Sequence, residues 1–194
     1  MLDLKGRKKV APVLKPIAAF LARLRLTPTV VTILGLVITV VGATLIAAGR
    51  LSLGAATAGF GTLLDALDGP LARLQGTATN RGAFLDTISD RFGEIAIWIG
   101  IAVFVRGDQR LLVLCIIGLV LSLLVPYIRA HAQVLGLEGK GGWMGRAERM
   151  IFILTGVGLV GFGLALEPIL WVFVALTGFT VAQRIWKTWQ QLGS

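Results

Sequence analysis

The stretch DALDGPLARLQGTATNRGAFLDTISD runs from Asp65 to Asp90 through a chain that is otherwise strongly apolar. Four aspartates, Asp65, Asp68, Asp86 and Asp90, lie in or beside its hydrophobic segments. Each charged side chain placed within a membrane-spanning helix costs ~2.5–3.5 kcal/mol on insertion scales, so four would cost about 10–14 kcal/mol. A protein does not keep that cost without compensation. The stretch therefore predicts a bound divalent cation or a water-filled cavity.

The spacing of the aspartates predicts two facing pairs. Asp65 and Asp68 are three residues apart and share one helical face. Asp86 and Asp90 are four residues apart and share another. A loop at about 74–81 would turn the two helices antiparallel, and both pairs would then face each other near the cytoplasmic end of the helices.

This pattern of carboxylates indicates Mg²⁺ or Mn²⁺ and a phosphorylated substrate. Hard oxygen ligands suit these ions better than zinc or copper. Two such ions ~3.5–4 Å apart would clamp a displacement at phosphorus. Gly69 and Gly82 would let a ligand or backbone come close, and Arg73 could hold a phosphate oxygen. The alternative is a set of interhelical hydrogen bonds and salt bridges, as in a transporter.

Composition places the rest of the chain in a membrane. Of 194 residues, 56% are hydrophobic and 15% are charged, against about 25% charged in a typical soluble domain. These values exclude a disordered chain. The net charge of +9 then indicates cytoplasmic loops beside anionic head groups, and no nucleic-acid partner. A single cysteine, Cys115, excludes an internal disulfide and a cysteine-based zinc site.

We expect residues 1–194 to form one all-α integral membrane domain with six transmembrane helices. The first span is long enough to cross ~30 Å of hydrocarbon, with Thr27 as its N-cap and Pro28 as its first helical residue. The last two spans abut at Glu167 and Pro168, which predicts a tight turn there. The expected spans are about 29–49, 51–68, 83–105, 111–129, 150–166 and 168–186.

The distribution of lysine and arginine predicts the orientation. An even number of spans puts both termini on one side. Fifteen of the basic residues fall on that side, and three, Arg50, Arg106 and Arg110, on the other. The positive-inside rule therefore places both termini, and with them the aspartates, on the cytoplasmic side of the cell membrane.

The segment before the first span has an amphipathic pattern. Residues 11–26, APVLKPIAAFLARLRL, carry apolar side chains at helical spacing with basic residues between them. This pattern predicts an N-terminal helix that lies in the cytoplasmic interface and contacts membrane lipids. The alternative is a simple flank to the first span.

The aspartate stretch resembles the motif of the CDP-alcohol phosphotransferase family, D-x2-D-G-x2-A-R-x(7–8)-G-x3-D-x3-D. Every fixed position of that motif is present here: Asp65, Asp68, Gly69, Ala72, Arg73, Gly82, Asp86 and Asp90. The resemblance implies an enzyme that displaces CMP from a CDP-linked donor, usually CDP-diacylglycerol, with an alcohol acceptor. It also implies Mg²⁺ or Mn²⁺ as cofactor and a homodimer.

The same resemblance implies roles for the motif residues. Asp65, Asp68 and Asp86 would ligate metal, and Asp90 would complete the site. Asp90 would also be the catalytic base that takes the proton of the acceptor hydroxyl. The remaining positions would bind the nucleotide and pyrophosphate of the CDP donor, namely Gly69, Ala72, Arg73 and Gly82.

Basic residues in the second half indicate an anionic acceptor such as a polyol phosphate. The sequences YIRAHAQ at 127–133 and RAER at 146–149 resemble the bacterial phosphatidylinositol-phosphate synthases, which implies inositol 1-phosphate as acceptor. By position, the candidates for binding the acceptor phosphate are Arg129, Arg149, Arg184, Arg146 and His131. Ordinary positive-inside charge is the alternative for each residue.

Other activities remain open from the sequence. The bacterial phosphatidylinositol-phosphate synthases are expected to have arginine in place of His131 and glutamate in place of Gln133. Because this chain departs from them at both positions, glycerol 3-phosphate is an alternative acceptor, as in phosphatidylglycerol-phosphate synthases. A small ion-coupled membrane transporter would use the aspartates to bind its coupling ion. An aspartate-rich membrane prenyltransferase would also hold a diphosphate through metal.

Overall fold

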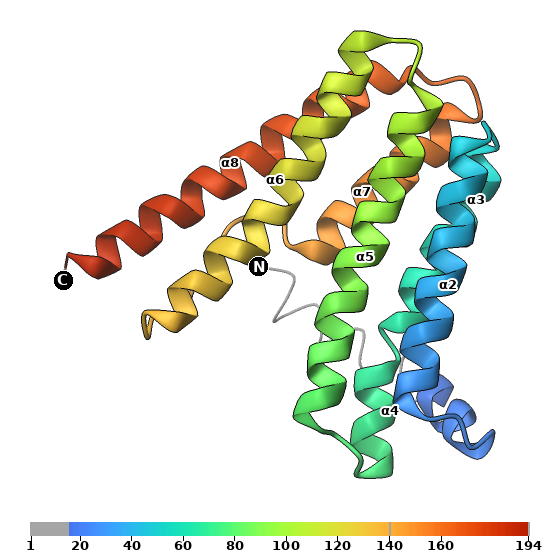
Figure 1. Cartoon of the computed structure of the whole chain (residues 1–194), viewed down its shortest axis with the longest axis vertical. Coiled ribbons are helices and arrows are strands. Elements are labelled where there is room, and N and C mark those ends of the chain that lie inside the picture. The colour runs from blue at the N-terminus through green and yellow to red at the C-terminus, as the bar shows by residue number, and fades with distance from the viewer. Residues whose placement is uncertain (1–15, 140, 194) are drawn as a thin grey trace.

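The computed structural model describes residues 16–139 and 141–193, and this part of the chain is helical without a strand (Figure 1). Residues 16–23 form a first helix. The elements that follow are α2 (Pro28–Ala47), α3 (Leu51–Asp65), α4 (Asp68–Gln75), α5 (Asn80–Phe104), α6 (Gln109–Val134), α7 (Arg146–Val160) and α8 (Leu166–Leu192). Figure 1 shows α6 and α8 side by side, leaning away from α2 and α5. The predicted all-α class is confirmed.

Three of these helices, α2, α6 and α8, are long and apolar enough to cross a membrane. Helices α3 and α7 have 15 residues each, fewer than the about 20 that a perpendicular span needs. Helix α5 has 25 residues and carries the charged end of the motif. Each expected span nevertheless overlaps one of the helices α2, α3, α5, α6, α7 and α8.

Helix ends follow local sequence signals. Thr27 is the N-cap of α2 and its side chain accepts a hydrogen bond from the Val30 amide, with Pro28 in the first turn, as predicted. Thr79 caps α5 by accepting from the Gly82 amide at 3.1 Å. Gly76 ends α4 at φ 66°, in the left-handed region that favours glycine.

Two expectations about local structure were wrong. The span expected at 51–68 breaks, since α3 ends at Asp65 and α4 begins at Asp68. The first aspartate pair therefore does not share the face of one continuous helix. The turn expected at Glu167 and Pro168 lies earlier, at 161–165, because Pro168 fits the first turn of α8, where a proline lacks no needed hydrogen bond.

Glycines let α2 and α3 pack closely. A Cβ added at Gly42 would lie 2.7 Å from both the Ala58 Cβ and the Gly54 carbonyl oxygen. These neighbours are backbone or nearly so, and they cannot rotate away. The contact holds α3, and with it Asp65 at the end of that helix, against α2.

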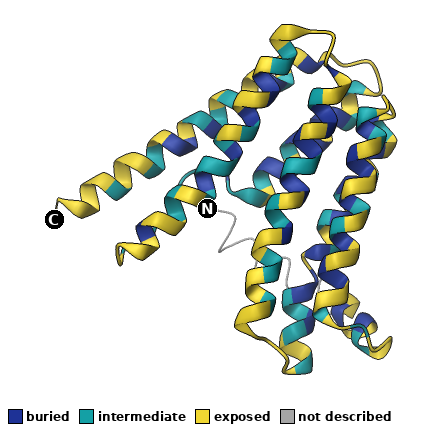
Figure 2. Cartoon of the chain, viewed as in Figure 1, coloured by how far each residue is buried: buried dark blue, intermediate teal, exposed yellow. Residues whose placement is uncertain are grey.

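A small apolar cluster fixes the segment around the motif. Ala18 and Leu21 of the first helix pack with Val31 of α2 and with Leu67 and Leu71 near α4. The predicted interfacial helix, 11–26, is thus helical over 16–23, while residues 11–15 lie outside the described part. Elsewhere many large apolar side chains are exposed on the outer helix faces (Figure 2), which is the surface a lipid environment would cover.

Candidate functional site

Three carboxylates from three helices converge at one point. Asp65 ends α3, Asp68 begins α4, and Asp86 lies in the second turn of α5. One carboxylate oxygen from each lies within 4.8 Å of the others. Asp65 and Asp68 are buried and Asp86 is half-buried. An all-oxygen set of this kind fits Mg²⁺ or Mn²⁺, whose charge would offset the repulsion between the carboxylates.

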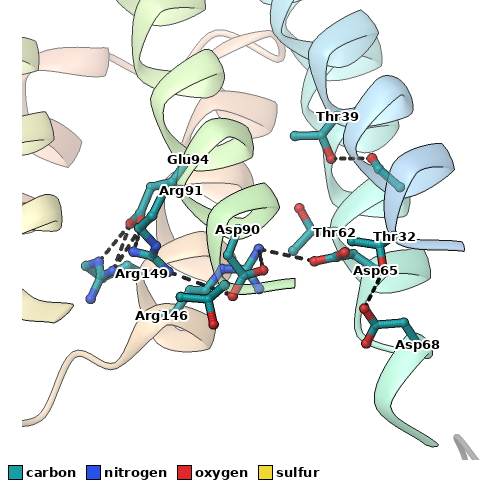
Figure 3. A network of polar contacts seen from close by, with 12 residues as sticks. Thr32, Thr39, Thr62, Asp65, Asp68, Asp90, Arg91, Glu94, Arg146 and Arg149 are labelled. Carbon is teal, nitrogen blue, oxygen red and sulfur yellow. Dashed lines mark hydrogen bonds and ion pairs between the residues drawn. The ribbon is translucent and has the colours of Figure 1, made fainter. Parts of the chain in front are cut away.

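Asp90 lies one turn beyond Asp86 and pairs with an arginine of α7. Arg146 Nη2 is 2.5 Å from Asp90 Oδ1 and 3.6 Å from Asp65 Oδ2 (Figure 3). Arg146 is the first residue of α7. The predicted acceptor-phosphate residue Arg146 therefore lies against the acidic cluster, where an anion bound by it would be next to Asp90.

A pocket of about 410 Å³ opens beside the cluster. Every residue predicted to bind the CDP donor lines it, together with Asp68 and Asp86: Gly69, Ala72, Arg73 and Gly82. The start of α2 contributes Thr27, Pro28, Thr29 and Thr32, and the loop after α4 contributes Thr77 and Thr79. A Cβ at Gly69 would meet Arg73 Nη1 at 3.5 Å, so this arginine lies over the glycine. The motif thus lines a cavity to which it contributes two carboxylates, those of Asp68 and Asp86.

Arg149, another predicted phosphate-binding residue, is in a buried ion pair. Its Nε and Nη2 donate to Glu94 Oε1 at 3.0 and 2.9 Å, and its Nη1 donates to the Met144 carbonyl at 3.2 Å. Arg91 Nη1 donates to Glu94 Oε2 at 2.6 Å from the other side. Arg149 is 1% exposed and Glu94 is fully buried. This network joins α5 to α7 one turn above the pair of Asp90 and Arg146.

The other predicted acceptor residues lie on α6 and α8. Arg184 of α8 donates to the carbonyl oxygens of Gly141, at 2.9 Å, and Val125, at 2.7 Å, and so ties α8 to α6 and to the loop before α7. Arg129 is half-buried on α6. His131 is exposed on α6, and its ring stacks on that of Tyr127 with centroids 6.2 Å apart. The five candidates therefore come from three helices.

Two residues of the site were missed by reasoning from the sequence. Thr32 donates a hydrogen bond of 2.6 Å to Asp68 Oδ2, across 36 residues of chain. Glu94 carries the ion-pair network described above. The sequence did contain a signal for Glu94. A charged residue within an apolar span costs free energy to insert, so its presence indicates a charged or polar partner in the fold. No comparable signal marks Thr32, since threonine is common in helices of every environment.

Comparison with known proteins agrees with this geometry. The chain matches the CDP-alcohol phosphatidyltransferase family over residues 25–183. The phosphatidylinositol phosphate synthase of Mycobacterium tuberculosis is 38% identical, over 100% of this chain and 93% of that protein. The enzyme of the same name from Corynebacterium glutamicum is 34% identical, over 95% of this chain and 88% of that protein.

Solved structures show the same fold. The crystal structure of the M. tuberculosis synthase with CDP-DAG bound has a TM-score of 0.84 and 38% identity, covering 92% of this chain and 94% of that one. The structure of that synthase in complex with manganese and citrate also has a TM-score of 0.84, covering 91% of this chain and 88% of that one.

Proposed function

The chain belongs to the CDP-alcohol phosphatidyltransferase family, and from this membership we propose that it is a phosphatidylinositol-phosphate synthase of phospholipid biosynthesis. It transfers the phosphatidyl group from CDP-diacylglycerol to inositol 1-phosphate and releases CMP. The observation that carries the proposal is the cluster of Asp65, Asp68 and Asp86, because two of its members, Asp68 and Asp86, line a pocket. The same pocket is lined by the motif residues Gly69, Ala72, Arg73 and Gly82. The names of the similar proteins support the choice of donor and acceptor.

The metal centre consists of Asp65, Asp68 and Asp86, completed by Asp90. Two Mg²⁺ or Mn²⁺ ions bound there would offset the negative charge on the pyrophosphate and on departing CMP. The manganese complex of the similar synthase supports this choice of ion. The carboxylates of this chain supply the hard oxygen ligands that such ions take.

Asp90 acts as the general base. It removes the proton of the acceptor hydroxyl, whose oxygen attacks the phosphorus attached to the lipid. The bond from that phosphorus to the bridging oxygen breaks, and CMP leaves with the electron pair. Arg146, 2.5 Å from Asp90, keeps this carboxylate oriented.

The donor and acceptor bind on opposite sides of Asp90. Gly69, Ala72, Arg73 and Gly82 hold the nucleotide and pyrophosphate in the pocket of about 410 Å³. The acceptor phosphate binds to basic residues of α6, α7 and α8, for which the candidates are Arg129, His131, Arg146, Arg149 and Arg184. Arg149 would bind the acceptor phosphate through Nη1, which would leave the carbonyl oxygen of Met144, while Nη2 keeps its hydrogen bond to Glu94.

We expect Arg129→Ala to raise the acceptor's apparent KM by about tenfold and to leave kcat little changed. A charged hydrogen bond made equally in the ground and transition states affects binding alone. Initial rates against inositol 1-phosphate concentration measure this effect. Arg110→Ala, at the other end of the same helix and exposed, is the control. An unchanged acceptor KM would remove Arg129 from the site.

The chain forms a single membrane domain over residues 1–194, with six spans, and acts as a homodimer in the cell membrane. The six spans are α2, α3, α5, α6, α7 and α8. Because α3 and α7 have only 15 residues each, they need flanking residues or local bilayer thinning to cross. The helix at 16–23 lies in the cytoplasmic interface, with Ile17 and Phe20 exposed towards lipid. Both termini and the active site are cytoplasmic.

Labelling of introduced cysteines tests this orientation. Gly107→Cys, in the loop between α5 and α6, should react in intact cells with a maleimide that cannot cross the membrane. Gln190→Cys, exposed near the end of α8, should react only after the cells are opened. The single native cysteine, Cys115, is buried and should give little background. The reverse pattern would overturn the orientation.

The activity is tested by CMP release from purified protein. The assay supplies CDP-diacylglycerol and Mg²⁺ and offers inositol 1-phosphate, glycerol 3-phosphate or free inositol in parallel. Turnover with inositol 1-phosphate alone is expected. Turnover with glycerol 3-phosphate alone would keep the chemistry and change the acceptor. No CMP release by folded protein with any acceptor would return the transporter hypothesis to consideration.

A further inference from the structure

We propose that Thr32 is a positioning residue that holds Asp68 in the orientation needed to ligate the divalent cation. The hydroxyl of Thr32 lies 2.6 Å from Asp68 Oδ2, and both side chains are buried (Figure 3). Thr32 is outside the aspartate motif and on a different helix. The inference rests on the metal centre of the proposed function and deepens it, because it names a residue that acts through a ligand.

The single proton of the Thr32 hydroxyl goes to Asp68. The hydroxyl has a second acceptor within reach, the Pro28 carbonyl oxygen at 3.1 Å. A hydroxyl donates one hydrogen bond. The contact to Asp68 is shorter by 0.5 Å, and its acceptor is a carboxylate, which binds a donor more strongly than a neutral carbonyl does.

Helices α2 and α4 pack against each other beside the hydrogen bond between Thr32 and Asp68. Val31, next to Thr32, packs with Leu67, next to Asp68, and with Leu71 one turn along α4. Val31 is 1% exposed and Leu71 is fully buried. Threonine is also β-branched and therefore stiff about its first side-chain torsion. The donor is thus fixed before any ligand binds.

Fixing the donor matters because an aspartate carboxylate rotates readily about its terminal torsion. The bond from Thr32 selects one rotation for Asp68, while Asp65 and Asp86 offer their oxygens nearby. Residues that hydrogen-bond to metal ligands in this way typically affect metal affinity by about 10–100-fold when they are replaced. We therefore expect the hydroxyl of Thr32 to contribute to cation affinity without touching the cation.

The test compares Thr32→Val, which removes the hydroxyl and keeps the shape, with Thr32→Ser, which keeps the hydroxyl. Thr177→Val is the matched control, because Thr177 is a fully buried threonine on α8 whose hydroxyl has no hydrogen-bond partner within the described residues. Mn²⁺ binding to detergent-solubilised protein is measured by the loss of the free-ion EPR signal, without CDP-diacylglycerol or acceptor. The Mn²⁺ dependence of CMP release is measured separately.

Thr32→Val should weaken Mn²⁺ binding by about 10-fold or more, with Thr32→Ser close to wild type and Thr177→Val unchanged. An unchanged Mn²⁺ affinity in folded Thr32→Val protein would overturn the inference, and so would an equal loss in Thr32→Ser. If Thr32→Val does not fold, Thr32→Ala takes its place with the same two criteria. No Mn²⁺ binding by wild-type protein would also overturn it.

The two proposals fail separately in this design. Weakened Mn²⁺ binding in Thr32→Val, together with no CMP release by wild-type protein, would retain the role of Thr32 and reject the proposed activity. Normal CMP release by wild-type protein, together with unchanged Mn²⁺ affinity in Thr32→Val, would retain the activity and reject the role of Thr32.

Discussion

Replacing Asp90 with asparagine is expected to lower kcat by about 10²–10⁴-fold, the range that a general base contributes, in protein that still folds in detergent. The amide of asparagine cannot accept the proton of the acceptor hydroxyl. It also removes the negative charge that faces Arg146 at 2.5 Å. Asp68→Asn should abolish turnover for a different reason, since it removes a charged ligand from the proposed metal centre. Initial rates of CMP release at saturating Mg²⁺ and substrates measure both effects.

Asp108→Asn is the matched control for these two variants. Asp108 caps α6 by accepting hydrogen bonds from the amides of Arg110 and Leu111. It is exposed and follows the C-terminal end of α5, whereas Asp86 lies near the N-terminal end of that helix. Asparagine caps a helix as well as aspartate does, so this variant should retain wild-type turnover. Substantial activity in Asp90→Asn or in Asp68→Asn would contradict the assignment of base and metal ligands.

The second large effect is on stability. Glu94→Gln should lower the free energy of unfolding by about 3–5 kcal/mol, because it leaves Arg149 as a buried charge without its counter-charge. The guanidinium of Arg149 is 1% exposed and donates three hydrogen bonds to Glu94, and Arg91 also loses a partner. Thermal and denaturant unfolding in one detergent give the size of the change.

Two further variants test whether the loss of stability in Glu94→Gln comes from the unpaired buried charge of Arg149. Glu167→Gln removes an exposed carboxylate from α8, so its effect should be within about 0.5 kcal/mol of zero. The double variant Glu94→Met with Arg149→Met removes both buried charges and should recover most of the lost stability, since apolar replacements of a buried pair are often neutral. If Glu94→Gln were no less stable than Glu167→Gln, the ion pair would not be what joins α5 to α7.

The same double variant bears on Arg149. If Arg149 binds the acceptor phosphate, the double variant should fold and show a raised acceptor KM. If the role of Arg149 is confined to the network with Glu94, the acceptor KM should be unchanged in the double variant. The acceptor phosphate would then be bound by Arg146 and the basic residues of α6 and α8. Arg146 is better placed for the phosphate, because its guanidinium already lies beside Asp90, where the acceptor hydroxyl must come.

Much of the architecture was predictable because it follows from local signals. Apolar runs of the right length predicted each long helix, and Thr27 with Pro28 predicted where α2 begins. The break between Asp65 and Asp68 was not predictable from spacing, since three residues fit one helical turn equally well. It arises where the chain turns from α3 into α4, under the packing of Leu67 and Leu71 against Val31.

The composition and motif by themselves determined that this is a helical membrane protein with four aspartates grouped near one end of its helices. Hydropathy and residue spacing are local properties, and a buried carboxylate requires a compensating charge wherever it lies. The tertiary structure alone decided how that compensation is divided. Asp65, Asp68 and Asp86 converge to within 4.8 Å of one another, whereas Asp90 pairs with Arg146 and Glu94 with Arg149. The last pair joins residues 55 positions apart, and contacts of that range depend on how helices pack against one another.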